Sequence, residues 1–146
     1  MEIKTFESEI TILESHLDTF GHVNNATYLT LYEQARWEMI TEGDWGLDRI
    51  MKEKVGPVIT NINIAFKREI TLREKIKIVS KVAGFVNPKI MTIEQKMIGT
   101  DGVIKNEMTM HAGLFDLKQR KLLPPSDDWM QAIGVTGDWR EEFEIK

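Results

Sequence analysis

The sequence has no cysteine, and that absence removes several kinds of chemistry at once. Without thiols the chain forms no disulfide, no thiolate nucleophile and no zinc–cysteine site, and it fits a reducing compartment. No apolar run approaches the roughly 20 residues that span a bilayer. The first ten residues, MEIKTFESEI, lack the basic start and apolar stretch of a signal peptide. The sequence therefore predicts a cytoplasmic protein without a membrane segment.

Net positive charge is lacking as well, since the 146 residues carry a formal charge of −4 and the pI is about 5.4. This balance argues against nucleic acid as a partner. The charge is uneven, because residues 67–100 hold eight basic and three acidic side chains. A hydrophobic share of 42% and a charged share of 29% are ordinary for a globular protein. We therefore expect a single domain over residues 1–146, with its core at about 8–123.

The spacing of apolar residues predicts one long helix among several strands. Helical spacing runs from Asn24 or Asn25, both good N-cap residues, to a stop at Gly43. Alternation after that helix predicts four strands in an antiparallel meander, joined by short polar turns. The five expected strands cover 9–13, 62–66, 76–84, 90–98 and 108–114. Shorter helices are expected at 45–54 and 126–133. The acidic tail is expected to matter little to the core, although its Trp139 and Phe143 could dock on the domain.

One helix and one sheet can bury each other's apolar faces, which predicts an α+β fold with a single sheet wrapped on the helix. Such a sheet leaves an edge strand and some apolar surface open to water. Pairing with a second copy would cover both, so we expect a homodimer or a homotetramer.

The most informative stretch is LDTFGHVNNATYLTLYEQAR, which runs from Leu17 to Arg36. Its turn residues, a histidine and two asparagines directly precede the long helix, and this is more polar chemistry than a turn and a helix cap require. A helix N-terminus carries unpaired N–H groups and about half a positive charge. The carboxylate of Asp18, just before that N-terminus, is placed to act on a group bound there.

This stretch resembles the hotdog-fold thioesterases of the 4-hydroxybenzoyl-CoA thioesterase type. The resemblance is carried by Asp18, Gly21, His22, Val23, Asn24, Asn25, Tyr28, Glu33 and Arg36, and the order of elements agrees over residues 8–123. It implies a hotdog fold, in which a five-stranded antiparallel sheet wraps one long central helix. It also implies hydrolysis of an acyl-CoA thioester to a free acid and CoA, with no metal or redox cofactor. One position departs from the family pattern, because His16 stands where a second Asp is common.

By this resemblance the catalytic residues are Asp18, Asn25 and His22. Asp18 is expected to act as the general base on water or as the nucleophile on the carbonyl carbon. The backbone N–H of Asn25 is the expected oxyanion donor. His22 is expected to shape the loop or to contact the thioester. A metal site of His16, Asp18 and His22 is a weak alternative, because its spacing matches no standard ligand pattern and a helix N-terminus repels a cation.

Four further residues are expected to bind the substrate. Tyr28 and Glu33 lie on the long helix, where Glu33 has the spacing of an ion pair with Arg36. Arg68 and Lys89 lie at strand ends in the basic middle of the chain, and we expect them to contact the phosphates of CoA. A solvated outer face is the alternative interpretation of these basic residues.

Two other functions are compatible with the same fold. Acyl-carrier-protein thioesterases share a similar stretch, but they have an Asn where Thr19-Phe20 stands here. A hotdog protein can also bind acyl-CoA without catalysis, because a fold alone does not establish an activity. The presence of Asp18 argues against a binding protein without chemistry.

Overall fold

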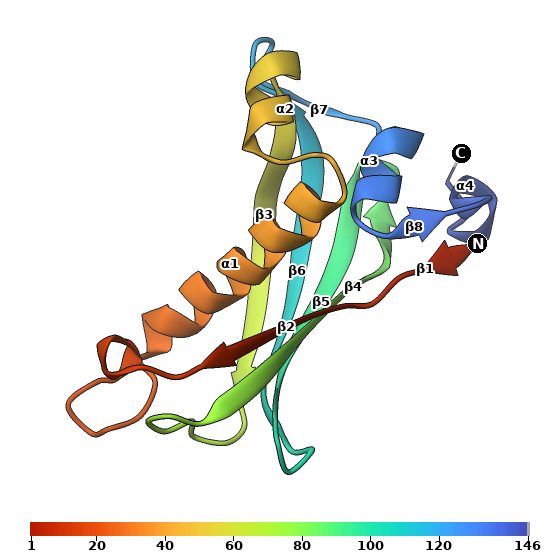
Figure 1. Ribbon diagram of the computed structural model, residues 1–146. Helices are drawn as coiled ribbons and strands as arrows, with labels where there is room; N and C mark the ends of the chain where they lie inside the picture. The colour runs from red at the N-terminus through yellow and green to blue at the C-terminus, as the bar shows by residue number, and fades with distance from the viewer. Residues whose placement is uncertain (146) are drawn as a thin grey trace.

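In the computed structural model, which describes residues 1–145, one long helix lies across a curled antiparallel sheet (Figure 1). Helix α1 spans Asn25–Glu42, and α2, α3 and α4 span Leu47–Glu53, Asp127–Ala132 and Trp139–Glu142. The main sheet consists of β2 (Phe6–Thr11), β3 (Val55–Phe66), β4 (Lys75–Asn87), β5 (Ile90–Gly99), β6 (Ile104–Asp116) and β7 (Lys121–Leu123). A separate pair joins β1 (Glu2–Ile3) to β8 (Val135–Thr136). Within residues 1–145, no helix is long and apolar enough to cross a membrane.

The order of strands across the main sheet is β2-β4-β5-β6-β3, with β7 beside the end of β6. The predicted meander is therefore right for β4, β5 and β6 but wrong for β3, which pairs with β6 instead of β4. The reason is that β2 occupies the edge of β4, so that β3 takes the free edge of β6. Pro57 suits this edge position, because proline has no N–H for a second neighbouring strand.

Both ends of α1 follow from their cap residues, and the predicted helix is confirmed. The Asn24 side-chain oxygen Oδ1 accepts a hydrogen bond from the Ala26 N–H at 3.0 Å. At the other end, the Gly43 N–H donates to the Met39 carbonyl oxygen. Helix α3 passes so close to this end that a Cβ on Gly43 would lie 2.1 Å from the Ala132 carbonyl oxygen. Glycine is therefore required there for packing.

The core lies between α1 and the concave face of the sheet. Helix α1 buries six residues against the sheet, namely Tyr28, Leu31, Tyr32, Ala35, Met39 and Ile40. The predicted alternation on β4 is confirmed, because Ile76, Ile78 and Val82 are buried. Leu29 differs from the helical pattern, because its side chain is 39% exposed on the flank of the helix.

A row of buried polar side chains crosses this apolar core. The Tyr32 hydroxyl donates to Asn106 Oδ1 at 2.8 Å. The Gln95 amide nitrogen Nε2 donates to the Tyr32 carbonyl oxygen and to the Ser80 hydroxyl, while Gln95 Oε1 accepts from Arg36 Nη1 at 2.8 Å. Most of these groups satisfy one another, which makes their burial tolerable, but Asn106 Nδ2 has no hydrogen-bond partner within residues 1–145. The row fixes α1 against β4, β5 and β6.

The C-terminal segment closes one end of the sheet, so the prediction that it matters little to the core is wrong. Trp139 is 2% exposed and stacks on Phe85 of β4, with ring centroids 5.9 Å apart. Its indole Nε1 donates to Asp127 Oδ1 at 3.0 Å. Strand β8 of the same segment pairs with β1, so this segment lies beside the start of the chain, as Figure 1 shows. Trp139, one of the two aromatic residues of the tail that could dock, is thus the anchor of this segment.

Candidate active site

Asp18 lies in a loop whose two ends are fastened together directly before α1. Leu17 and Val23 form an antiparallel bridge, and the Asp18 N–H donates to the His22 carbonyl oxygen at 2.8 Å. Gly21 has a φ of 83°, a left-handed conformation that glycine adopts without strain. The chain therefore reverses within a few residues, and this reversal sets Asp18 beside the start of the helix.

The two oxygens of the Asp18 carboxylate have different surroundings. Oδ1 accepts hydrogen bonds from the Phe20 N–H at 2.9 Å and from the His22 N–H at 3.3 Å. Oδ2 accepts no hydrogen bond from residues 1–145, and the side chain is half-buried. One oxygen thus stabilises the loop, as expected of an Asp in a turn. The other is left available to act on a bound molecule.

The first N–H groups of α1 differ in their acceptors. The Ala26 N–H donates to the Asn24 side chain, and the Thr27 N–H donates to the Asn24 carbonyl oxygen at 2.9 Å. The N–H of Asn25 has no acceptor among the described residues, and Asn25 is exposed. A free N–H at a helix N-terminus can stabilise an oxyanion that forms next to it.

His22 is held by a neighbouring loop that the sequence did not connect with it. Its imidazole Nε2 lies 2.9 Å from the Glu69 carboxylate, and its backbone forms a bridge with Thr71. The Val23 N–H adds a hydrogen bond to the Ile70 carbonyl oxygen at 3.0 Å. These contacts tie the Asp18 loop to the connection between β3 and β4. Glu69 was missed because it is distant in sequence and follows no local spacing pattern.

Tyr28 lies in the core at the N-terminal end of α1. Its side chain is 4% exposed, and its ring meets the edge of the Phe66 ring with centroids 5.1 Å apart. Burial raises the pKa of the Tyr28 hydroxyl, and the charges of Glu74 and Asp18 raise it further. The hydroxyl is therefore neutral at physiological pH. Tyr28 therefore packs between the start of α1 and the end of β3.

The predicted ion pair between Glu33 and Arg36 does not form within residues 1–145. Glu33 is exposed, whereas Arg36 points to the sheet and donates to Gln95 Oε1. The pair fails because the Arg36 guanidinium is turned inward to Gln95 while Glu33 stays at the surface. Burial lowers the pKa of the Arg36 guanidinium, and the charge of Glu33 partly offsets this effect. Gln95 was not predicted as the partner, because the contact joins a helix to a strand far along the chain.

Arg68 and Lys89 are both exposed, but one chain does not bring them together. Arg68 follows the end of β3, where Phe66 pairs with Asn106 of β6. Lys89 lies in the turn before Ile90, which pairs with Gly113 of β6. Those two positions on β6 are about 23 Å apart at roughly 3.3 Å per strand residue. The two cations therefore lie at opposite ends of the sheet in a single chain.

Several other cations of residues 67–100 are paired with carboxylates on the surface. Lys67 lies 3.2 Å from Glu107, Lys77 lies 3.6 Å from Glu7, and Lys81 lies 3.8 Å from Glu94. These exposed contacts favour the solvated-face interpretation for these three lysines. Arg68 and Lys89 form no such ion pair in the described part of the chain, so their charges remain available to a phosphate.

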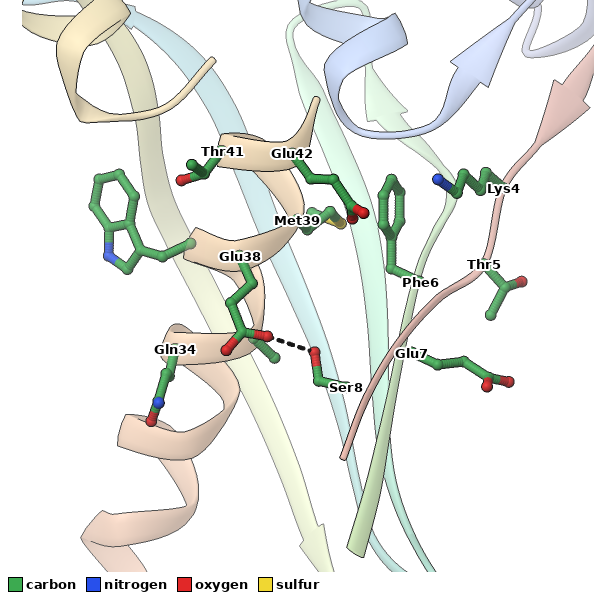
Figure 2. A pocket seen from close by; sticks show the side chains of 12 residues that line it. Lys4, Thr5, Phe6, Glu7, Ser8, Gln34, Glu38, Met39, Thr41 and Glu42 are labelled. Carbon is green, nitrogen blue, oxygen red and sulfur yellow. Dashed lines mark hydrogen bonds between the residues drawn. The ribbon is translucent and has the colours of Figure 1, made fainter. Parts of the chain in front are cut away.

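Two hollows flank α1. An open groove of about 910 Å³ lies between α1 and β2 and is lined by Glu7, Glu38 and Glu42 among others (Figure 2). The Ser8 hydroxyl donates to Glu38 across this groove at 2.8 Å, as Figure 2 shows. A second cavity, of about 330 Å³, lies between α1, β3 and α3 and has mostly apolar walls. Ligand pockets of proteins usually have such apolar walls and a volume of about 300–1,000 Å³.

The two histidines near Asp18 both have protein partners. The His16 ring nitrogen Nδ1 accepts a hydrogen bond from the Leu13 N–H at 2.9 Å, and His22 contacts Glu69. Across the described residues 1–145, no three His, Asp or Glu side chains gather in the manner of a metal site. Both histidines therefore take part in holding the structure around Asp18.

A helix packed across a curled antiparallel sheet is the hotdog architecture, and the predicted hotdog fold is confirmed by structural comparison. The chain belongs to the thioesterase-like superfamily, whose family model matches residues 13–133. It is therefore a thioester hydrolase, as the resemblance implied.

Individual relatives agree with this assignment. The chain is 27% identical over 139 residues to the long-chain acyl-CoA thioesterase FadM of Escherichia coli K12, covering 94% of this chain and 96% of FadM. The crystal structure of the probable thioesterase YbaW from Escherichia coli superposes with a TM-score of 0.77 at 26% identity, covering 88% of this chain and 98% of that one. The protein SAV2348 of Staphylococcus aureus, solved in complex with CoA, has the same fold, with a TM-score of 0.82 at 12% identity over 100% and 96% of the two chains.

Proposed function

We propose that the protein is an acyl-CoA thioesterase in which Asp18 activates the attacking water or attacks the thioester itself. The observation that carries this proposal is the Asp18 carboxylate beside the start of α1, with Oδ1 engaged in its own loop and Oδ2 free. The thioester carbonyl oxygen points to the N–H of Asn25, which has no acceptor within residues 1–145. The similarity to an acyl-CoA thioesterase over nearly the whole chain supports the choice of CoA as the thiol.

The general-base route uses these groups in a single sequence of events. Water attacks the carbonyl carbon while Asp18 takes its proton, and the Asn25 N–H stabilises the negative charge that forms on the carbonyl oxygen. The carbon–sulfur bond then breaks, and the proton returns from Asp18 to the CoA thiolate. In the nucleophilic route, Asp18 attacks first, CoA leaves, and water hydrolyses the anhydride. His22, held by Glu69, keeps the loop in place for both routes.

The active form in this proposal is at least a homodimer that pairs through the free edge of β3. Tyr28 contacts Phe66, so the N-terminus of α1 lies beside the end of β3, and the apolar cavity lies beside its beginning at Pro57 and Val58. Antiparallel pairing of two β3 strands places the end of each strand against the beginning of the other. Each Asp18 loop then faces the cavity of the partner copy, and each active site is composite.

The same arrangement gives the predicted substrate-binding residues their roles. In the antiparallel pair, Arg68 of one copy lies at the same end of the joined sheet as Lys89 of the partner subunit, so that both can serve one CoA. Tyr28 forms the wall beside the thioester. Glu33 lies at the rim of the apolar cavity, where its exposed carboxylate contacts the entering acyl group.

The test is a thiol-release assay with matched acyl groups carried by CoA, by pantetheine and by acyl carrier protein. We expect hydrolysis of the CoA thioesters with a kcat/KM well above that of the carrier-protein thioesters. A higher kcat/KM for the carrier-protein thioesters would instead identify the protein as an acyl-carrier-protein thioesterase. Binding of acyl-CoA without thiol release would identify a binding protein and overturn the proposed chemistry.

A further inference from the structure

The cavity between α1, β3 and α3, which we call the side cavity, is open at one end and closed at the other. At its rim lie Glu33, Trp37 and Ile59, and all three are exposed. At its floor lie Ala112, Trp129 and Ile133, of which none is more than 1% exposed. The side cavity is therefore a blind pocket that enters the core of the chain.

The floor of the side cavity offers no polar partner to a ligand. The indole Nε1 of Trp129 already donates to the sulfur of Met91 at 3.4 Å. Arg36 is the one cation among the lining residues, and its guanidinium is turned to Gln95. The carboxylate of Glu33 thus lies at the rim, and the polar side-chain atoms of Arg36 and Trp129 are already engaged in other contacts. A ligand hydroxyl at the floor would be buried without a hydrogen bond, which is unfavourable, whereas a hydrocarbon group meets only apolar contacts.

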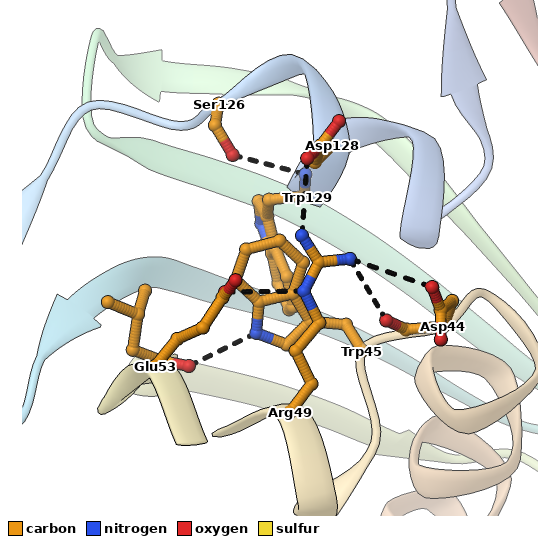
Figure 3. Close-up of polar contacts among 8 residues, drawn as sticks. Asp44, Trp45, Arg49, Glu53, Ser126, Asp128 and Trp129 are labelled. Carbon is orange, nitrogen blue, oxygen red and sulfur yellow. Dashed lines mark hydrogen bonds and ion pairs between the residues drawn. The ribbon is translucent and has the colours of Figure 1, made fainter. Parts of the chain in front are cut away.

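Contacts outside the cavity also hold Trp129 of the floor in place (Figure 3). The ring of Trp45 meets Trp129 edge-on, with centroids 5.6 Å apart, and the Ser126 hydroxyl accepts from the Trp129 N–H at 3.2 Å. The Arg49 guanidinium lies over the Trp45 ring at 3.9 Å and donates to Asp128 at 3.2 Å. These bonds tie α2 to α3, so that Trp129 cannot withdraw to admit a longer ligand without breaking them.

We propose that the side cavity receives the hydrocarbon end of a linear aliphatic acyl chain, and that Ala112 and Trp129 set the longest chain the enzyme accepts. This inference rests on the proposed function. It needs the thioester to be bound at the Asp18 loop of one copy, which in the proposed dimer faces the side cavity of the other copy. An aliphatic chain suits a cavity of about 330 Å³ whose buried end is apolar. A hydroxylated aromatic acyl group would bring its hydroxyl to that floor and lose a hydrogen bond to water.

The experiment compares Ala112→Leu with the wild-type enzyme on a series of saturated acyl-CoAs from butyryl-CoA to hexadecanoyl-CoA, with 4-hydroxybenzoyl-CoA as an aromatic probe. The added leucine carbons fill the floor. Because excluding a methylene group from a hydrophobic pocket costs about tenfold or more, we expect the ratio of kcat/KM for the longest and shortest accepted chains to fall by at least about tenfold. We expect the aromatic probe to be a poor substrate of the wild type.

Two further variants keep the test decisive. Ala83→Leu makes the same change at an exposed position of β4, and we expect its chain-length profile to match the wild type. If Ala112→Leu does not fold, Val58→Phe narrows the same cavity from its half-buried wall and should give the same change of profile. An unchanged profile in a folded filling variant, or equal loss for all chain lengths, would overturn the proposal. Absence of hydrolysis of every acyl-CoA by the wild type would instead overturn the proposed function.

Discussion

The two oxygens of Asp18 separate the folding role of this side chain from its proposed chemistry. Asparagine retains the oxygen that accepts from Phe20 and His22, but it has no basic or nucleophilic second oxygen. We therefore expect Asp18→Asn to keep the melting temperature of the wild type and to lose at least about 3 kcal/mol of transition-state stabilisation, or about a hundredfold in turnover. Thiol release and thermal unfolding measure the two effects on the same sample.

Asp18→Ala serves as the matched control for the loop. It removes both oxygens, so it should lose turnover and also loosen the loop, with a lower melting temperature. Turnover by Asp18→Asn within a few-fold of the wild type would rule out Asp18 as base or nucleophile.

Tyr32 illustrates a buried hydroxyl with a structural role. Its O–H donates to Asn106, whose side chain is fully buried and whose amide nitrogen Nδ2 has no partner within residues 1–145. Tyr32→Phe would leave both polar atoms of that amide unpaired, and we expect a loss of about 1–3 kcal/mol in the free energy of unfolding. Tyr28→Phe is the matched control, because the Tyr28 hydroxyl has no hydrogen-bond partner in the described residues. Urea unfolding should show a larger loss of stability for Tyr32→Phe than for Tyr28→Phe. Equal losses would contradict the structural role of the Tyr32 hydroxyl.

At the scale of elements, the C-terminal segment contributes more to stability than its acidic sequence indicates. Trp139 is almost fully buried, stacks on Phe85 and donates to Asp127. We expect Trp139→Ala to reduce the free energy of unfolding by about 3–5 kcal/mol, as for other buried aromatic residues. Trp37→Ala removes a side chain that is 39% exposed and should have a clearly smaller effect in the same urea titration. A similar, small effect for both would mean that the segment is only loosely attached.

The elements that could be predicted from the sequence are those with local signals. Helix α1 was predicted closely because Asn24 and Gly43 mark its ends, and β4, β5 and β6 because they alternate and are joined by short turns. The place of β3 could not be predicted, since consecutive strands usually pair and only the position of β2 prevents it here.

The same distinction holds for the candidate site. The Asp18 loop and the start of α1 are contiguous in sequence, so their residues could be named in advance. The contacts of His22 with Glu69 and of Arg36 with Gln95 join distant segments and could not be named. Gln95 does fall at an inward position of β5, between Ile93 and Met97, so the alternation could have indicated a buried polar group but not its partner.

At the scale of the whole molecule, the proposed dimer has a direct test on β3. Ile62 is 38% exposed in the single chain and lies on the edge strand outside the side cavity. A charge there would be buried by pairing of the two β3 edges, so we expect Ile62→Lys to shift the protein toward a 16.9 kDa monomer and to lose turnover with it. Val86→Lys, at a position that is 55% exposed on β4, should remain a dimer. Light scattering at the assay concentration measures the mass of each variant. A fully active monomer would exclude active sites that are shared between two copies.

The charge of the whole molecule gives a second prediction, on ionic strength. Arg68 and Lys89 are exposed, so contacts with CoA phosphates should each contribute only about 1 kcal/mol and weaken with salt. We expect KM for acyl-CoA to rise several-fold from low to high ionic strength, and KM for the matching pantetheine thioester to change little. If KM rises equally with ionic strength for both substrates, Arg68 and Lys89 do not bind the phosphates of CoA.

The two edges of the main sheet are unequal, and this inequality bears on aggregation. The edge strand β3 has twelve residues with exposed Ile59, Ile62 and Phe66, whereas the opposite edge, β2, has six residues and includes Glu7 and Glu9. Once two copies have joined through β3, the short strand β2 with Glu7 and Glu9 forms the outer edge of the main sheet on each side, and like charges oppose strand addition there. A twofold contact of this kind closes on itself, so the sheet cannot extend into a filament. The long apolar edge of a single chain is therefore a hazard only for as long as that chain is unpaired.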